Sequence, residues 1–180
     1  IPRAPSVSSL SSGMREVEVV GLRVEMPSNV PVLLLRENSG KRRVMSIYVG
    51  GPEASAIHSA LEGVTPPRPL THDVTVDLLA AVGARIVRVV VTEVRDQTYY
   101  AEIVLRDEGG ERTVSARPSD GVALALRAGA GVWVADDLMD EVGREVAEDA
   151  ESDEDDETVV DEFRDFLDTI SPEDFSDPTS

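Results

Sequence analysis

The sequence lacks cysteine entirely, which excludes disulfide bonds, zinc sites built on cysteine and a thiolate nucleophile. It holds one Trp, three Tyr and three Phe, so a hydrophobic core must be built mainly from Val, Leu, Ile and Ala. No apolar run approaches the roughly 20 residues that a membrane-spanning helix needs. We therefore expect a cytoplasmic protein with no membrane partner.

The familiar catalytic motifs are missing as well. The chain contains no Walker loop, no HExxH or GxSxG sequence and no glycine-rich dinucleotide fingerprint. Its two histidines, His58 and His72, limit imidazole chemistry to two positions. A catalytic site must therefore be sought among less specific groups of charged residues.

The net charge of −18 is concentrated at the C-terminal end. Residues 136–180 hold 20 of the 35 acidic residues and two of the 17 basic ones, whereas residues 1–135 hold 15 of each. A dense run of like charge is usually a solvated, disordered segment. The acidity therefore lies in the tail. The remainder of the chain is neutral, so its charge does not exclude nucleic acid as a partner.

These features divide the chain into four segments. Residues 1–13 are rich in Ser and Pro, and we interpret them as a disordered leader or a vector remnant, with Met14 as the natural start. One folded domain is expected over residues 14–145, followed by an acidic disordered linker over 146–157 and a tail over 158–180. The tail should form a short amphipathic helix, since its apolar residues recur at helical spacing: Val159, Phe163, Phe166, Leu167 and Ile170. Two alternatives stay open for this helix, which docks either on the folded domain or on a protein partner.

The hydrophobic pattern of the folded domain predicts an α+β fold. Alternating apolar and polar residues predict strands, as in REVEVVGLRVE, and Asn, Ser, Asp and Gly mark the turns between them. Helical spacing predicts helices that begin near Gly51, at an N-cap formed by Thr71, and at a cap formed by Ser119 or Asp120. The expected apolar face of the second helix consists of Val74, Leu78, Leu79 and Val82.

An internal repeat supports this organisation. LLLRENSGKRRV (33–44) and IVLRDEGGERTV (103–114) align without gaps, and the same offset aligns VEVV (17–20) with VRVV (87–90). We interpret the match as an internal duplication of a β-β-β-α unit, with chance similarity of two hairpins as the alternative. Two such units would form one mixed sheet packed with helices and would share a core.

The segment RPLTHDVTVD holds the densest group of polar residues in the domain. Asp73 and Asp77 lie one helical turn apart, a spacing at which two carboxylates can share a divalent metal, and His72 beside them can act as an acid or base. Arg68 precedes them. The plainer interpretation is that Asp73 favours the helix dipole and Asp77 is a solvated residue.

The segment RPSD precedes the third predicted helix. Its plain interpretation is a helix start, with Pro118 ending the strand and a polar cap following. The functional interpretation is that free N–H groups at this helix start hold a phosphate, clamped by Arg117. If the duplication holds, Glu53, Arg117 and Asp120 converge, because the two helix starts occupy equivalent places.

Several segments together resemble the bifunctional nuclease domain family, also called DUF151. They are VEVVGLRVE, PVLLLRE, the helix after GGPEA, PPRPLTHD, YYAEI and SARPSDGVALALR, and the tail EFRDFLDTISPEDF is similar to that of actinobacterial members. The resemblance covers 14–145 and the tail. It implies an α+β domain, homo-oligomerisation and nuclease activity on DNA and RNA.

From this resemblance we expect a nuclease that hydrolyses phosphodiester bonds in DNA or RNA with a divalent metal, Mg²⁺ or Mn²⁺. The candidate catalytic residues are His72, Asp73 and Asp120, the candidate substrate-binding residues are Arg68, Arg117 and Ser119, and the candidate metal ligands are Asp73, Asp77 and Glu53. The alternative is a regulatory module without enzymatic activity that binds a ligand or protein and carries a C-terminal docking helix.

Overall fold

A computed structural model describes residues 13–145 of the chain. It contains one sheet of seven strands, in the order β3-β2-β1-β7-β4-β5-β6, and four helices. The strands are β1 (Met14–Glu25), β2 (Val30–Glu37), β3 (Val44–Tyr48), β4 (Arg85–Arg95), β5 (Thr98–Asp107), β6 (Gly110–Ala116) and β7 (Gly131–Ala135). The helices are α1 (Gly51–Leu61), α2 (Thr71–Ala81), α3 (Pro118–Ala128) and α4 (Asp136–Val142).

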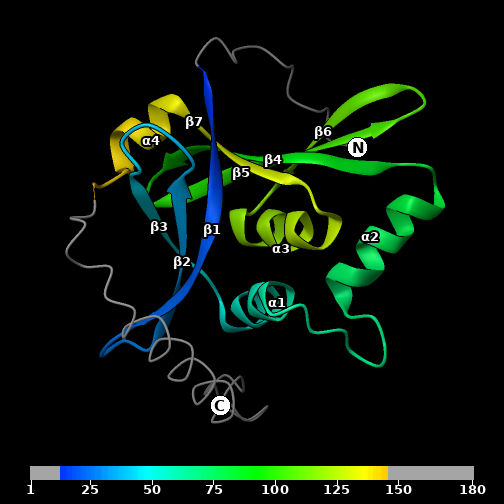
Figure 1. Cartoon of the computed structure of the whole chain (residues 1–180), viewed down its shortest axis with the longest axis horizontal. Coiled ribbons are helices and arrows are strands. Elements are labelled where there is room, and N and C mark those ends of the chain that lie inside the picture. Colours follow the sequence, from blue (N-terminus) through cyan, green and yellow to red (C-terminus); the bar gives the residue numbers. More distant parts are fainter. Residues whose placement is uncertain (1–12, 146–180) are drawn as a thin grey trace, which may run out of the picture.

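The sheet consists of two antiparallel three-stranded units on either side of β7. Strands β1, β2 and β3 form one unit, and β4, β5 and β6 form the other. Strand β7 joins them, pairing antiparallel with β1 and parallel with β4. The sheet is therefore mixed, and the described strands confirm the α+β expectation (Figure 1).

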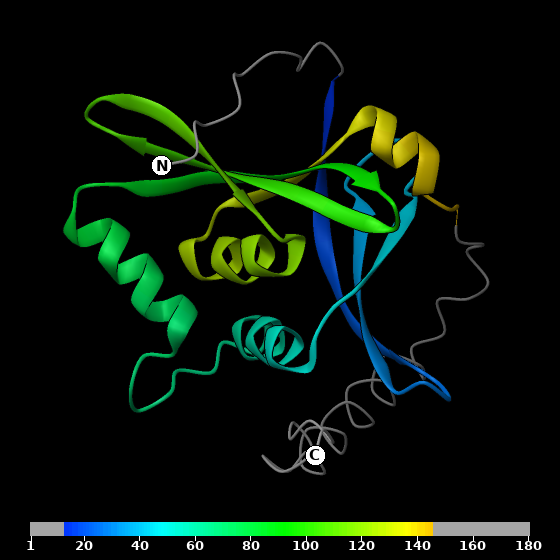
Figure 2. The same cartoon turned by 180° about the vertical axis from the view of Figure 1, so that it is seen from behind.

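Helices α1 and α3 pack against each other and against the sheet. Helix α3 contacts β4, β5 and β7, while α1 contacts β1 and β2. Helix α2 contacts α3 and β4 but stands at one end of the molecule, away from α4, in both views (Figures 1 and 2). Fully buried side chains from both three-stranded units and from the helices build one core: Leu33, Leu35, Met45, Ile57, Val89, Val91, Val122, Val134 and Met139.

The element order repeats strand–strand–strand–helix twice, first as β1–β3 with α1 and then as β4–β6 with α3. This order agrees with the unit predicted from the repeat, although a duplication of the chain itself stays a prediction. None of the helices within residues 13–145 is long and apolar enough to cross a membrane. The predicted linker and tail helix lie outside the described residues.

Two predicted helix caps are wrong. Helix α2 has Leu70 at its N-cap, with Thr71 as its first residue, because the carboxylate of Asp73 accepts the Leu70 backbone N–H at 2.8 Å and secures the turn. Helix α3 begins at Pro118, so Arg117 is its N-cap. Neither Ser119 nor Asp120 caps it, since proline at the first helical position brings the start forward.

The predicted apolar face of α2 is covered only in part. Leu79 packs against the core, but Val74, Leu78 and Val82 are 39, 61 and 75% exposed. No residue of α2 is buried. Periodicity in a sequence identifies an apolar side of a helix, whereas tertiary packing decides whether that side is covered.

Candidate functional site

The beginnings of α1, α2 and α3 meet around the side chain of Arg117. This guanidinium donates to both carboxylate oxygens of Asp120, at 2.7 Å from Nε and 3.1 Å from Nη2. Its Nη2 also donates to Glu53 Oε1 at 2.7 Å. The convergence expected for these three residues is therefore present.

His72 joins the group from the first turn of α2. Its Nε2 atom lies 3.7 Å from Asp120 Oδ1, which makes an ion pair when the imidazole is protonated. The His72 side chain is 17% exposed, as is Glu53, whereas Arg117 is 65% exposed. We call these four residues, Glu53, His72, Arg117 and Asp120, the Arg117 cluster.

Local sequence explains how Arg117 reaches its partners. Pro118 disfavours a helical conformation at the preceding residue, and Arg117 is extended with φ −73° and ψ 146°. Its side chain is thus placed beside the first turn of α3. Hydrogen bonds from Arg117 to Asp120, and then to Glu53, raise the pKa of Arg117 above its ordinary value, so the group stays cationic.

A second ion pair ties the same three helices together closer to the core. Arg127, on α3, donates from Nε to Asp73 Oδ1 at 2.6 Å. Its Nη1 atom donates to the backbone carbonyls of Ala56 on α1 and Ala123 on α3, both at 3.0 Å. The Arg127 side chain is only 10% exposed, so this pair is held in one geometry.

The Asp73 carboxylate is occupied at both oxygens. One oxygen accepts from Arg127 and the other from the Leu70 backbone. The Leu70 hydrogen bond first, and Arg127 second, hold the pKa of Asp73 below its usual value. The geometry therefore favours a structural role for Asp73, as the anchor of the start of α2.

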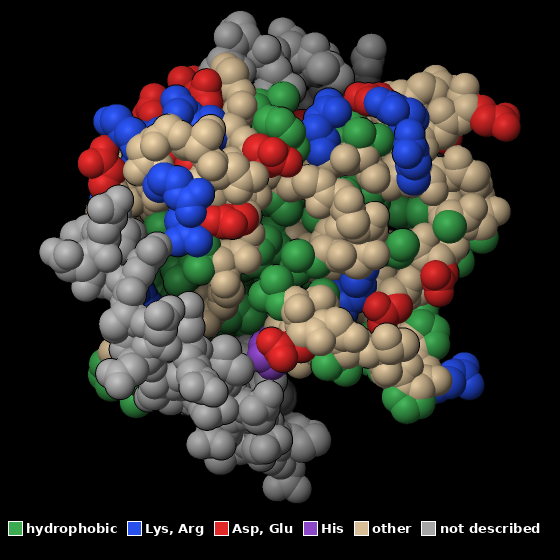
Figure 3. All heavy atoms as spheres, in the orientation of Figure 1, with side chains coloured by type: hydrophobic (Ala, Val, Ile, Leu, Met, Phe, Trp, Pro, Cys, Tyr) green, Lys and Arg blue, Asp and Glu red, His purple; other side chains and the backbone are tan. Residues whose placement is uncertain are grey.

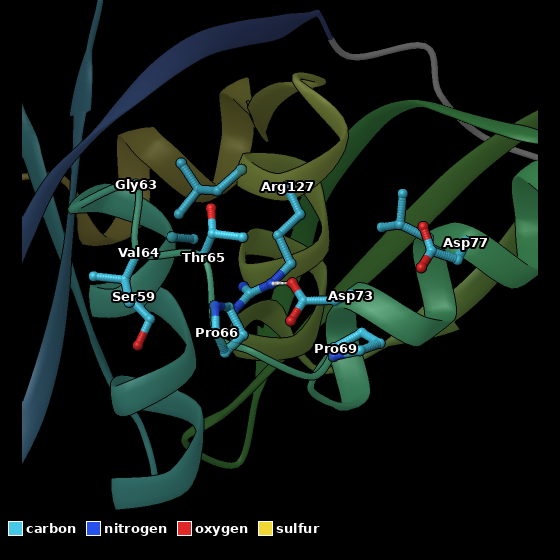
Figure 4. A pocket seen from close by; sticks show the side chains of 12 residues that line it. Ser59, Gly63, Val64, Thr65, Pro66, Pro69, Asp73, Asp77 and Arg127 are labelled. Atoms are coloured by element: carbon cyan, nitrogen blue, oxygen red, sulfur yellow. Dashed lines mark hydrogen bonds and ion pairs between the residues drawn. The ribbon is translucent and has the colours of Figure 1, made fainter.

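A cleft of about 560 Å³ opens beside this pair, between α1, α2 and α3. Its wall includes Ser59, Thr65, Asp73, Asp77 and Arg127. Figure 4 shows Asp73 pointing toward Arg127, while Asp77 lies further along α2. The cleft is mixed in character, because all three helices and the connecting loop contribute polar residues beside apolar ones such as Val64, Val76 and Leu126.

The other predicted site residues are more dispersed. Ser119 is buried in the first turn of α3. Arg68 is exposed in the loop before α2, and within residues 13–145 neither it nor Asp77 makes a hydrogen bond or ion pair. No group of three or more His, Asp or Glu side chains in this part of the chain is arranged to hold a metal ion.

Sequence reasoning missed Arg127. The only local sign is one cation in the otherwise apolar helix sequence GVALALRAG. A basic residue in the last turn of a helix is ordinarily read as a partner of the helix dipole. Its contact with Asp73, 54 residues earlier, depends on how α2 and α3 pack.

In the Arg117 cluster, a cation (Arg117) and a group that can act as acid or base (His72) both lie against the carboxylate of Asp120. A guanidinium can bind a phosphate through two parallel hydrogen bonds, and an imidazole can transfer a proton near neutral pH. Asp120 is hydrogen-bonded to the Arg117 guanidinium and lies near the His72 imidazole. This combination suits chemistry on a phosphate ester, provided that a phosphate displaces at least one carboxylate from Arg117.

Comparison with known proteins connects this site to a family. A family model described as bifunctional nuclease domain matches residues 33–147. Two relatives in Mycobacterium tuberculosis, the uncharacterized proteins MT1877 (strain CDC 1551 / Oshkosh) and Rv1829 (strain ATCC 25618 / H37Rv), are each 45% identical over 167 residues. The match covers 90% of this chain and 98% of each relative.

Proposed function

Because the chain belongs to the bifunctional nuclease domain family, we propose that it hydrolyses phosphodiester bonds in DNA, RNA or both. The observation that carries this proposal is that His72 and Arg117 both lie against one carboxylate, that of Asp120. The family supplies the reaction class, and the Arg117 cluster supplies groups of suitable chemistry.

In this proposal Arg117 binds the scissile phosphate and stabilises the negative charge that grows on its oxygens in the transition state. His72 transfers a proton, either from the attacking water or to the leaving oxygen. Asp120 orients both groups and stabilises the protonated imidazole. Glu53 keeps the guanidinium in place until substrate binds.

The proposal includes a divalent metal, Mg²⁺ or Mn²⁺, although two of the predicted ligands, Asp73 and Glu53, are engaged by arginine side chains. Asp73 is engaged by Arg127, and the carboxylates of Glu53 and Asp120 share Arg117. The predicted ligand set of Asp73, Asp77 and Glu53 is not gathered around one point within the described residues. The steps above therefore use only side chains of the chain itself.

The test is cleavage of single- and double-stranded DNA and RNA by the purified chain, with Mg²⁺, with Mn²⁺ and with EDTA. His72→Gln should lower the cleavage rate by about 10²–10⁴-fold, the usual contribution of a positioned acid or base. His58→Gln is the matched control, because it removes the other histidine of the chain and lies outside the Arg117 cluster. Equal loss in both variants, or full activity in His72→Gln, would contradict the assignment.

A binding module without enzymatic activity is the second candidate, and one observation favours it. Both arginines of the site are already neutralised, Arg117 by two carboxylates and Arg127 by Asp73. If no substrate is cut under any metal condition, nucleic acid should still be tested as a ligand by fluorescence anisotropy. Binding that survives His72→Gln but is lost in Arg117→Met would support this alternative.

Homo-oligomerisation belongs to the proposal as well, since the family resemblance implies it. Light scattering coupled to size-exclusion chromatography of the full chain tests it directly. A mass equal to one chain of 19.4 kDa over the micromolar range would refute it.

A further inference from the structure

Helix α2 carries an apolar stripe that the rest of the described chain leaves uncovered. Leu70, Val74, Leu78 and Val82 recur every four residues and are between 39 and 75% exposed. We call these four residues the α2 stripe. Hydrophobic side chains are visible on the right-hand side of the molecule in Figure 3, where Figure 1 places α2. Rows of this kind on a helix are typical docking surfaces for another amphipathic helix.

Two unpaired arginines flank the stripe. Arg68 precedes α2 and Arg85 follows it, and both are exposed. Neither makes a hydrogen bond or ion pair with any residue in 13–145. Most other arginines of the folded domain are paired with an acidic side chain, as Arg106 is with Glu111. The surface around α2 therefore combines an apolar centre with a free cation at each end, and one exposed carboxylate, Asp77, lies between them. Its complement is apolar in the middle and acidic at both ends.

The sequence contains such a complement in residues 158–170. Its apolar residues are at helical spacing, as described above, and four acidic residues lie between them against a single Arg164: Asp161, Glu162, Asp165 and Asp168. We propose that residues 158–170 dock on the α2 stripe of the same chain, with acidic side chains directed toward Arg68 and Arg85. This proposal is independent of the proposed nuclease function.

Charge favours this segment over a second copy of α2. Two stripes packed antiparallel about Leu78 would bring the Arg68 end of one copy to the Arg85 end of the other, so like charges would meet. Like charges across an interface oppose association, whereas the acidic segment offers each arginine an opposite charge.

The connecting chain is long enough to allow docking within one molecule. Twelve residues, 146–157, separate Glu145, the last described residue, from Thr158. Fully extended, they span roughly 40 Å. This reach is similar to the diameter of a compact domain of this size, about 36 Å from its expected radius of gyration, so a linker that follows the surface must be extended to reach α2. Self-repulsion among the acidic residues of 146–157 favours such extended conformations.

Docking would place the segment beside the cleft that contains Asp73 and Asp77, and over Arg68. Any anionic ligand of Arg68 would then compete with the acidic residues of the segment. The same surface would lose most of its exposed apolar area, since the stripe includes four of the ten large exposed hydrophobic residues of the described chain.

The absence of cysteine makes a disulfide test direct, because only introduced cysteines can react. The full chain carrying Leu78→Cys and Phe166→Cys should form an intramolecular disulfide under mild oxidation at low protein concentration. The matched control pairs Phe166→Cys with Tyr48→Cys on β3, which is 62% exposed. Strand β3 pairs with Arg144 where the tail departs, so simple tethering favours the control. We expect the Leu78 pair to react at least about tenfold faster.

Three outcomes would overturn the proposal. The first is equal reaction of the Leu78 and Tyr48 pairs. The second is a Leu78–Leu78 cross-link between two chains in the single variant Leu78→Cys. The third is a Leu78–Phe166 cross-link that forms only between chains when the two single variants are mixed. Reversal of both charges, Arg68→Glu with Arg85→Glu, should slow the intramolecular reaction several-fold at low salt.

Hydrogen exchange provides a second measurement without cysteine. In the full chain, amides of α2 should exchange more slowly than in the variant Phe163→Asp/Phe166→Asp, because docking stabilises this peripheral helix. Amides of α3 serve as the internal reference, since seven of its eleven residues are buried in the core. Identical exchange of α2 in both proteins would refute the docking.

Discussion

Arg117 Nη2 lies 2.7 Å from Glu53 Oε1, although 64 residues separate them along the chain. The contact joins the start of α3 to the first turn of α1, the two helices that follow the two three-stranded units of the sheet. Asp120 completes the pair, and His72 adds the start of α2. The candidate site therefore depends on the relative placement of both halves of the domain.

Replacement of Arg117 tests its proposed role in binding the reacting phosphate. Arg117→Met should lower kcat/KM for nucleic acid cleavage by about 10²–10³-fold, because it removes a cation aimed at developing negative charge. Its free energy of unfolding should change by less than about 1 kcal/mol, since the side chain is 65% exposed and solvent screens its ion pairs. Cleavage assays and urea unfolding of the same preparation separate the two effects. Full activity in Arg117→Met would contradict the role.

Replacement of Arg127 should act on stability. Arg127→Met leaves Asp73 and the carbonyls of Ala56 and Ala123 without a donor in a largely buried position. We expect a loss of about 3 kcal/mol in the free energy of unfolding, measured by urea denaturation. Arg68→Met is the control and should stay within about 0.5 kcal/mol, because Arg68 has no partner in the described chain. A similar loss of unfolding free energy in Arg127→Met and Arg68→Met would show that the Arg127 contacts do not hold the three helices together.

Asp73→Asn separates a structural from a catalytic role for this carboxylate. If Asp73 anchors α2 through Arg127, the variant and the double variant Asp73→Asn/Arg127→Met should unfold with similar, non-additive losses of free energy. Cleavage by Asp73→Asn should then fall no further than its unfolded fraction explains. Complete loss of activity in a stably folded Asp73→Asn protein would restore Asp73 to the catalytic group.

Glu37 should control stability in acid. Its carboxylate is 1% exposed and accepts hydrogen bonds from Arg43 Nε at 3.1 Å and Nη2 at 2.9 Å, with Arg15 Nη1 at 3.3 Å. The Arg43 hydrogen bond is the largest cause that holds the pKa of Glu37 below its ordinary value of 4.5. Because the pKa is lowered in the folded state, the stabilisation is complete above pH 4.5 and is lost as the pH falls below that value.

Glu37→Gln provides the measurement. At neutral pH the variant should lose about 3–5 kcal/mol, because Arg43 becomes a buried cation without its main partner. Between about pH 5 and pH 3 its free energy of unfolding should fall less steeply than that of the unmodified chain. Parallel pH profiles for the two proteins would show that Glu37 does not titrate in this range.

A side chain at Gly121 should lower the free energy of unfolding, because Val89 occupies the space that it would need. A Cβ atom at this position would lie 2.7 Å from Val89 Cγ1, and Val89 is fully buried. Gly121→Ala should therefore cost about 1–3 kcal/mol, the usual range for overpacking. The loss should be smaller when Gly121→Ala is introduced into Val89→Ala, where the methyl group has space. Thermal unfolding of the unmodified chain, the two single variants and the double variant measures this difference.

Most elements of the domain could be predicted because they depend on local pattern. The alternation in REVEVVGLRVE predicts β1, and Pro52 and Glu53 predict the beginning of α1. The two wrong caps fell where a proline or a local hydrogen bond to a side chain competes with intrinsic preference. Thr71 is a favourable N-cap residue in general, but the bond from Leu70 to Asp73 moves the cap one residue earlier.

The candidate site was predicted in composition but not in its pairing. RPLTHDVTVD and RPSD were identified as charged helix starts, and the proximity of Glu53, Arg117 and Asp120 was expected from the repeat. The partner of Asp73 was not predicted. Arg127 lies near the end of α3, and no local sequence pattern specifies how α3 is rotated relative to α2. Likewise the apolar side of α2 was recognised, while its exposure depends on how far α2 stands from the sheet.

The sequence by itself determined that the chain has no thiol chemistry, that its folded part alternates strands and helices, and that its acidity lies at one end. These properties follow from composition and short-range periodicity. Only the tertiary structure decided that Arg117 is shared by Glu53 and Asp120, that Arg127 holds Asp73, and that the α2 stripe faces outward. Contacts between distant residues depend on the angles and distances at which whole helices pack, which spacing along the chain does not specify.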